Sequence, residues 1–148
     1  MARIHILIGS VYGNAIEVAL SASQQLEQQG HSTTVMREPE LDALLADNPE
    51  VLLVVTSTTG DGEIPNNLLP FYLDLRERFP LMPQVRYGVI ALGDSGYVNF
   101  AEAGRMMDDQ LRELQATPAT PMLFIDACET PDPEEAAESW LTSWQTKL

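Results

Sequence analysis

Short apolar runs recur along the chain, and each is bounded by polar or turn-forming residues. Five of them are predicted to be strands: residues 3–8, 32–36, 51–56, 87–92 and 122–127. The first, third and fourth are almost continuously apolar, which is typical of strands covered on both faces. The second, with the sequence STTVM, is more polar and fits the edge of a sheet.

Between these runs the apolar residues follow the period of an α-helix. Their predicted buried faces are Ile16, Ala19, Leu20 and Leu26; Leu68, Tyr72, Leu75 and Phe79; Met107, Leu111 and Leu114; and Ala137, Trp140, Leu141 and Trp144. Gly30 supplies a stop for the first helix, and Pro70 falls in the first turn of the second, where proline is tolerated. Asp132 and Pro133 predict the start of the last helix. Residues 39–48 indicate only a short turn or a single helical turn.

Strands that alternate with helices predict right-handed crossovers and a parallel sheet. We therefore expect an α/β fold: one five-stranded, doubly wound sheet between two layers of helices, in a single domain over residues 1–148. In such a sheet, ligands bind beyond the carboxyl ends of the strands. The segments that follow the inner strands are thus the places to look for function.

The charge balance excludes one class of function. Twenty-two acidic residues stand against eight basic ones, for a net charge of −14. Nucleic acid requires the opposite sign. No apolar run reaches the about 18 residues that a membrane helix needs. The apolar run near the N-terminus is too short for the core of a secretory signal. Cys128 is the single cysteine, so no internal disulfide can form. These features predict a cytoplasmic protein.

Three segments rich in glycine, hydroxyl and amide residues follow the inner strands. They are GSVYGNA (residues 9–15), TSTTGDGEIPNN (56–67) and GDSGYVNF (93–100). The first lacks the lysine of a nucleotide-hydrolase P-loop and the G-x-G-x-x-G spacing of a dinucleotide site. It could still hold a phosphate through backbone N–H groups at a helix N-terminus. A single loop of this kind is more often a plain strand-to-helix turn.

Taken together, the three segments resemble those of the flavodoxins, small electron carriers that bind flavin mononucleotide (FMN). The resemblance spans the chain and points to a short-chain, MioC-like member, in part because the fifth strand is expected to run unbroken into the last turn. The family implies the sheet order 2-1-3-4-5 with FMN at the switch between strands one and three. It also implies a redox protein without catalytic residues or a metal.

The resemblance assigns cofactor contacts by segment. Ser10, Gly13 and Asn14 match the phosphate loop, Ser57 and Thr58 match the hydroxyls on the phosphate side, and Gly60 matches the residue whose carbonyl turns toward the flavin N5. Gly93, Asp94 and Tyr97 match the loop at the pyrimidine edge, with Tyr97 stacking on the ring. The complete predicted set is Ser10, Val11, Tyr12, Gly13, Asn14, Ala15, Ser57, Thr58, Thr59, Gly60, Asp61, Gly93, Asp94, Tyr97, Asn99 and Phe100.

Several residues depart from the family pattern. Val11, Tyr12 and Ala15 stand where hydroxyl residues are usual, which leaves fewer side-chain donors for a phosphate. Thr59 stands where many flavodoxins carry an aromatic residue on the inner face of the ring. The sequence therefore does not determine how tightly FMN binds or which residue covers the inner face of the flavin ring.

The implied function is the transfer of single electrons at low potential by a monomer. Its partners would be a basic-faced, NADPH-dependent flavodoxin reductase and acceptor oxidoreductases, with no nucleic acid or membrane. Acidic loops oppose the negative charge that an electron adds to the flavin. At about 10 Å and a dielectric constant of about 20, one carboxylate costs roughly 1.7 kcal/mol, or roughly 70 mV before screening.

Two other functions stay open. One is a flavin-dependent NAD(P)H quinone or FMN reductase, although such enzymes often use inserted loops and a dimer interface, and all loops in this chain are short. The other is a regulatory flavodoxin-like protein with weak FMN binding, which the departures at Val11, Ala15 and Thr59 make conceivable.

Overall fold

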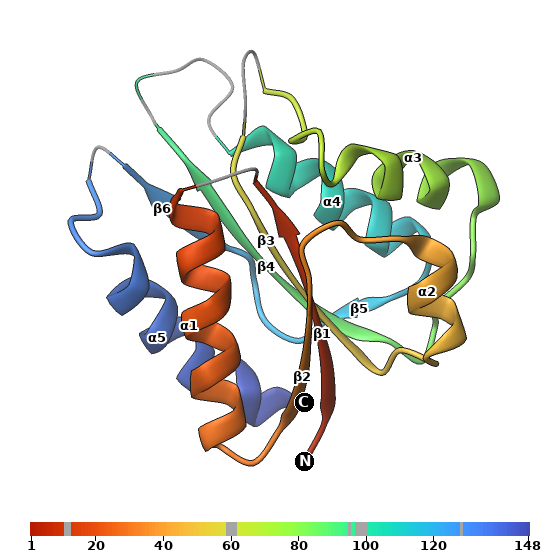
Figure 1. Ribbon diagram of the computed structural model, residues 1–148, viewed down its shortest axis with the longest axis horizontal. Coiled ribbons are helices and arrows are strands. Elements are labelled where there is room, and N and C mark those ends of the chain that lie inside the picture. The colour runs from red at the N-terminus through yellow and green to blue at the C-terminus, as the bar shows by residue number, and fades with distance from the viewer. Residues whose placement is uncertain (11–12, 59–61, 95, 97–100, 128) are drawn as a thin grey trace.

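A central parallel sheet separates two layers of helices in the computed structural model (Figure 1), which describes residues 1–10, 13–58, 62–94, 96, 101–127 and 129–148. The strands are β1 (Arg3–Gly9), β2 (Ser32–Met36), β3 (Val51–Thr56), β4 (Arg86–Gly93), β5 (Thr117–Pro118) and β6 (Leu123–Asp126). Their order is β2-β1-β3-β4-β5, and β6 also pairs with β4. The expected α/β fold with the order 2-1-3-4-5 is confirmed. The polar β2 lies at the edge, as its composition predicted.

The predicted fifth strand, residues 122–127, is present as β6, but a further short strand that was not predicted precedes it at the fifth position of the sheet. Two short strands share it: β5 pairs with Arg86 and Tyr87, and β6 pairs with residues 90–93 of β4. Prolines at 118 and 121 have no N–H to donate, so a continuous ladder cannot form through this stretch. The N–H of Ala119 still donates to the carbonyl of Tyr87 at 2.9 Å, which keeps the chain against β4 between the two strands.

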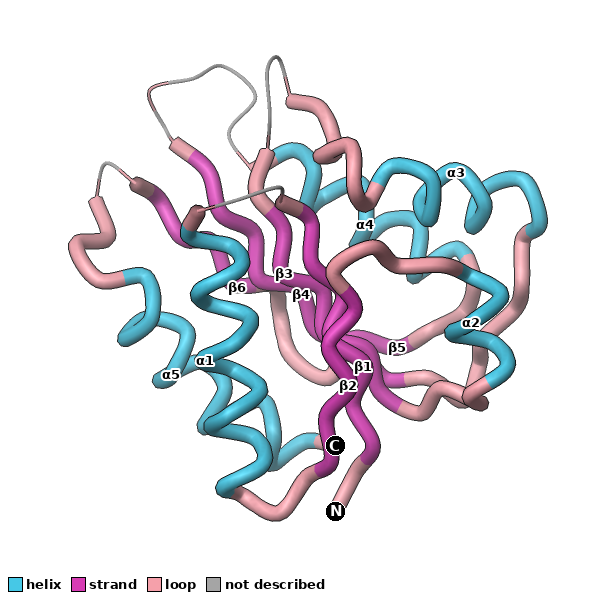
Figure 2. Tube along the Cα trace, viewed as in Figure 1, coloured by secondary structure: helices cyan, strands magenta, loops and turns pink. Residues whose placement is uncertain are grey.

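The helices divide between the two faces of the sheet (Figure 2). α1 (Asn14–Gln28) and α5 (Pro133–Trp144), which continues into a 3-10 turn at Gln145–Lys147, cover one face. α2 (Leu41–Ala46), α3 (Leu69–Arg78) and α4 (Glu102–Glu113) cover the other. Each layer has its own hydrophobic core, because alternate residues of the buried strands point to opposite faces. The strands β1, β3 and β4 are thus apolar on both sides, as their sequences predicted.

Local signals set the ends of several helices. The carboxylate of Asp132 accepts a hydrogen bond from the N–H of Glu135 at 3.1 Å, and Pro133 occupies the first helical position of α5, as predicted. Gly30 has a φ of 95° and follows Gln29, the C-cap of α1, which confirms the predicted stop.

Two predicted core residues are exposed instead. Leu20 is 42% exposed, because α1 packs through Ala15, Val18 and Ala22, on a face rotated from the predicted one. Phe79 is 47% exposed, because it leaves α3 in the left-handed conformation with a φ of 47° and turns away from the sheet.

Both termini lie at the amino edge of the sheet, close together at the bottom of Figure 1. Met1 and Leu148 line the same surface depression beside Arg86. Within the described residues, none of the helices combines the length and apolar character needed to cross a bilayer.

Candidate functional site

The carboxyl ends of β1, β3 and β4 meet at one edge of the sheet, at the top of Figure 1. In the register of the sheet, Gly9 pairs with Thr56, and Thr56 pairs with Ala91. The three loop segments singled out in the sequence therefore start side by side. This edge is the candidate site.

The first segment leaves β1 through a closely packed glycine. A Cβ atom on Gly9 would overlap the side chain of Thr56, so no larger residue fits. The carbonyl of Gly9 accepts hydrogen bonds from the Ser57 N–H at 2.9 Å and from the Ser57 hydroxyl at 3.1 Å. Ser10 follows and is buried. The end of β1 is therefore fixed against the start of the second segment.

The N-terminus of α1 faces the same edge. Its N-cap, Gly13, has φ 98° and ψ −152°, and none of the side chains that the structure describes forms a cap hydrogen bond there. A Cβ at Gly13 would meet nothing within 4 Å, so space is open around it. Asn14 is exposed, whereas Ala15 is buried and can offer only its backbone N–H. A 15-residue helix directs a partial positive charge and unbonded N–H groups to such an end.

The second segment links the neighbouring loops to one another. The hydroxyl of Thr58 accepts a hydrogen bond from the Ala103 N–H at 3.2 Å, in the first turn of α4. Because this bond uses an acceptor lone pair, the Thr58 O–H remains able to donate. Further along, Asn67 donates from one side-chain nitrogen to the carbonyls of Ile8 and Arg37. Sequence reasoning gave Asn67 no role, since an amide that bridges distant segments leaves no periodic signal.

The third segment is anchored on β6. The carbonyl of Gly93 accepts a hydrogen bond from the Ala127 N–H at 2.8 Å. The carboxylate of Asp94 accepts one from the Gly96 N–H at 2.8 Å, which forms a local turn just past the strand.

Part of the predicted cofactor set is thus brought together at this edge. Ser10, Gly13, Asn14, Ala15, Ser57, Thr58, Gly93 and Asp94 all lie at the ends of the three strands or at the start of α1. The other predicted contacts fall outside the described residues: Val11, Tyr12, Thr59, Gly60, Asp61, Tyr97, Asn99 and Phe100. All predicted cofactor contacts therefore stay predictions; for Gly93 and Asp94 the structure gives the position at the end of β4 and no contact with a flavin.

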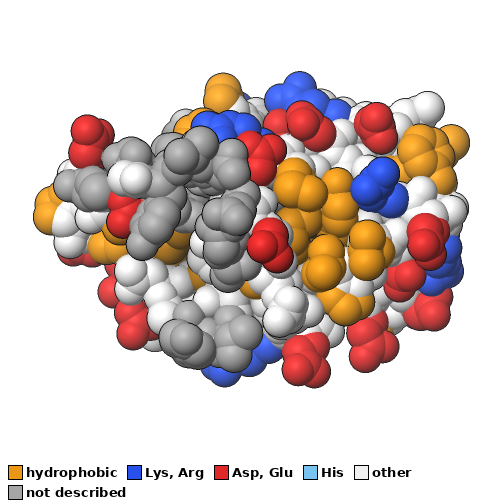
Figure 3. Space-filling model, turned by 90° about the horizontal axis from the view of Figure 1, so that it is seen from above, with side chains coloured by type: hydrophobic (Ala, Val, Ile, Leu, Met, Phe, Trp, Pro, Cys, Tyr) orange, Lys and Arg blue, Asp and Glu red, His pale blue; other side chains and the backbone are white. Residues whose placement is uncertain are grey.

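The electrostatics of the edge are predominantly acidic. Glu17 lies in the first turn of α1, and Glu63 and Asp94 lie in the second and third segments. Figure 3 looks down on this edge and shows Asp and Glu side chains on several sides of it. Arg105, in the first turns of α4, lies 3.8 Å from the carboxylate of Glu102, with its guanidinium 5.2 Å from the ring centroid of Phe124.

One strongly perturbed group lies away from the edge. Burial, reinforced by the carboxylate of Asp108, raises the pKa of the Tyr87 phenol well above its usual range. The phenol donates to that carboxylate at 2.6 Å. Tyr87 lies near the amino end of β4, so this pair supports the fold rather than the candidate site.

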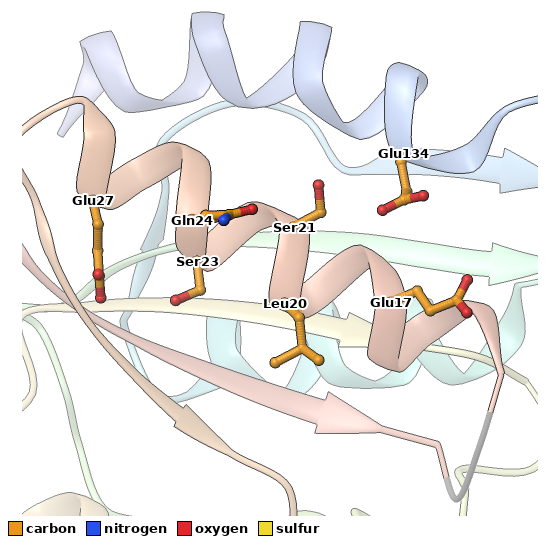
Figure 4. Close-up of a pocket in the computed structure, with 7 residues that line it drawn as sticks. All are labelled: Glu17, Leu20, Ser21, Ser23, Gln24, Glu27 and Glu134. Carbon is orange, nitrogen blue, oxygen red and sulfur yellow. The ribbon is translucent and has the colours of Figure 1, made fainter.

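A second depression runs along α1 beside α5 and has a volume of about 530 Å³ (Figure 4). Glu17, Glu27 and Glu134 contribute carboxylates to its lining, and Glu134 points from α5 toward α1. None of its lining residues is basic. An anion would be repelled there, which separates this depression from the phosphate site considered above.

The edge suits a phosphate held by neutral groups. Within the described part of the chain the α1 N-terminus has no side-chain cap, and the space at Gly13 is open. The hydroxyls of Ser10 and Thr58 come from two adjacent segments. Helix N-termini bind anions through their N–H groups and dipole without a lysine. The described residues therefore fit the phosphate of FMN. Across those residues, no three His, Cys, Asp or Glu side chains gather in a way that could hold a metal ion.

Comparison with known proteins agrees with this geometry. The family model for flavodoxin matches residues 6–140. The chain is 44% identical to Flavodoxin YqcA of Escherichia coli K12, over all of this chain and 99% of that protein. It is 37% identical to Protein MioC of the same organism, also over all of this chain and 99% of that protein. A solved cysteine-to-alanine mutant of a flavodoxin from Pseudomonas aeruginosa superposes with a TM-score of 0.93 at 44% identity, covering 99% of this chain and 98% of that one.

Proposed function

The chain belongs to the flavodoxin family, and from that premise we propose that it shuttles single electrons at low potential between a reductase and acceptor oxidoreductases. Flavodoxins bind FMN and are electron carriers, so FMN binding and electron transfer follow from the family. The observation that carries the residue-level proposal is the uncapped N-terminus of α1 at the edge where three strands end.

In this proposal, neutral groups hold the FMN phosphate. The N–H groups at the start of α1, the Ser10 hydroxyl and the Asn14 amide come from the first segment. Thr58 adds a hydroxyl whose proton can donate, because its oxygen is the acceptor in the bond with the Ala103 N–H. The Ser57 hydroxyl donates to the Gly9 carbonyl, so it must turn away from that carbonyl before it can donate to a phosphate. The expected order of importance is therefore Thr58 above Ser57.

The flavin ring would lie between the second and third segments. Gly93 and Asp94 hold the strand end on that side. Thr59, Gly60, Asp61, Tyr97, Asn99 and Phe100 complete the proposed contacts, together with Val11 and Tyr12 at the phosphate side. When bound, FMN supplies the one-electron redox chemistry.

The carboxylates of the chain set the proposed low potential. Glu17 lies in the first turn of α1, and Glu63 and Asp94 lie in the second and third segments. Each of these carboxylates opposes a further negative charge at the site. The same carboxylates favour encounter with a basic surface, which fits a reductase and acceptors whose docking faces carry lysine and arginine. We place the protein in the cytoplasm, acting as a monomer.

An FMN titration of the apoprotein tests the proposal. Tight binding with quenched flavin fluorescence is the expected result, and a colourless protein that ignores FMN would refute it. Mixing the FMN-loaded protein with NADPH then distinguishes a carrier from a reductase. A carrier stays yellow until a flavodoxin reductase is added, whereas rapid bleaching by NADPH alone would indicate a reductase.

A further inference from the structure

The side-chain amide of Asn67 connects the end of β1 and the residue after β2 to the second segment. Its nitrogen donates to the carbonyl of Ile8 at 2.6 Å and to the carbonyl of Arg37 at 2.7 Å. Ile8 precedes the first segment by one residue, Arg37 directly follows β2, and Asn67 itself ends the second segment. The bonds therefore join parts of the chain that are 59 and 30 residues apart in sequence.

The orientation of this amide is dictated by its partners. Both are carbonyl oxygens, so only the two N–H groups of the amide can satisfy them. Turning the amide over would place its oxygen against two other oxygens. The Oδ1 atom is buried and has no hydrogen-bond partner among the residues that the structure describes, which is unfavourable by itself. The contribution of Asn67 therefore comes from its two N–H donors, since its Oδ1 atom forms no hydrogen bond with the described residues.

Asn67 also supplies a bond that the sheet cannot make. Successive carbonyls of a strand point to opposite sides, and the Gly9 carbonyl faces β3, since it accepts from the Ser57 N–H. The Ile8 carbonyl therefore faces β2. However, β2 ends at Met36, which pairs with Leu7, so no further β2 residue continues the ladder. The amide of Asn67 takes the place of the missing strand donor.

We propose that Asn67 is a positioning residue for the phosphate of the bound flavin, an inference that rests on the function proposed above. It fixes the carbonyl two residues before Ser10 from the β2 side, while Ser57 fixes the Gly9 carbonyl from the β3 side. With both carbonyls held, the chain leaves β1 in one direction toward Gly13 and the start of α1. Without the Asn67 bonds, the first segment loses its fixed origin, and the phosphate loses its preorganised donors.

The test compares FMN with riboflavin, which has the same ring but no phosphate. Asn67→Leu removes both donors at nearly the same size, and Asn66→Leu, at the exposed neighbouring asparagine, is the matched control. Loss of two hydrogen bonds is expected to weaken FMN binding by roughly tenfold. Riboflavin binding should change less than twofold, and Asn66→Leu should leave both affinities unchanged. Inorganic phosphate should raise the melting temperature of the wild-type apoprotein more than that of the Asn67→Leu apoprotein.

The outcomes separate this inference from the proposed function. If the wild-type protein binds FMN and Asn67→Leu weakens FMN and riboflavin equally, Asn67 only supports the fold and the inference is overturned. An unchanged FMN affinity overturns it as well. If Asn67→Leu does not fold, the ratio of the two affinities is read from Asn67→Ser, which keeps one donor and should show an intermediate loss. A wild-type protein that binds no FMN at all instead refutes the proposed function.

Discussion

Gly13 offers the sharpest test of the phosphate site, because its conformation and its surroundings separate two effects. Its φ of 98° and ψ of −152° belong to a region that is essentially restricted to glycine. A Cβ there would meet nothing within 4 Å, so Gly13→Ala introduces backbone strain without a steric clash. The expected strain is about 1–3 kcal/mol, which corresponds to a roughly 5- to 150-fold loss of FMN affinity if the bound conformation requires this backbone.

The other end of the same helix provides the control. Gly30 has a φ of 95°, and a Cβ there would contact only the Met1 side chain, at 3.3 Å. Gly30→Ala should therefore also lower the melting temperature, by roughly 2–4 °C per kcal/mol of strain in a domain of this size. It lies at the opposite edge from Gly13, so FMN affinity should not change.

The assay is a fluorescence titration of each apoprotein with FMN, combined with thermal unfolding followed by circular dichroism. Gly13→Ala is expected to lower affinity and Gly30→Ala only stability. Equal losses of FMN affinity in the two variants would show that backbone strain weakens FMN binding by destabilising the whole fold and not by altering the phosphate site. An unchanged affinity in Gly13→Ala would show that the N-terminus of α1 does not hold the phosphate, and the proposed site would have to be abandoned.

Three further predictions concern other parts of the molecule. The raised pKa of Tyr87 means that only the unfolded chain ionises this phenol near pH 10, so stability should fall as pH rises above about 10. Tyr87→Phe should remove that part of the decline and should cost about 1 kcal/mol at neutral pH through the lost bond to Asp108, as urea unfolding at several pH values would reveal. Gly88→Ala would place a Cβ 2.5 Å from the indole nitrogen of Trp144 and should destabilise by about 1–3 kcal/mol with FMN affinity retained; an unshifted melting temperature would contradict the packing. Thr58→Val should weaken FMN binding several-fold, Thr58→Ser should restore it, and a valine variant with wild-type affinity would remove this hydroxyl from the site.

The sequence predicted the sheet well because its signals are local. Strands buried on both faces must be apolar throughout, so β1, β3 and β4 were visible as continuous runs. The short strand β5 was not predicted, because a two-residue strand, Thr117–Pro118, has no detectable period. Phe79 was misjudged because helical spacing cannot reveal that a residue leaves the helix in the left-handed conformation.

The candidate site was only partly predictable. Turn-forming residues after the strands pointed to one edge, and the structure brings the ends of β1, β3 and β4 together there, since parallel strands end together by topology. The bonds that tie these segments to one another connect residues distant in sequence, as between Thr58 and Ala103 or between Asn67 and Ile8. Such bonds depend on the register of the folded sheet, and a single sequence carries no record of it.

The placement of the two chain ends has a practical consequence for attaching tags, fusion partners or surfaces to this protein. Met1 and Leu148 emerge next to each other at the amino edge, on the far side of the sheet from the ends of β1, β3 and β4. An affinity handle, a fused enzyme or an electrode linker attached at either end would leave the opposite rim exposed to solution. A short peptide that joins the two ends would likewise permit new ends to be opened elsewhere.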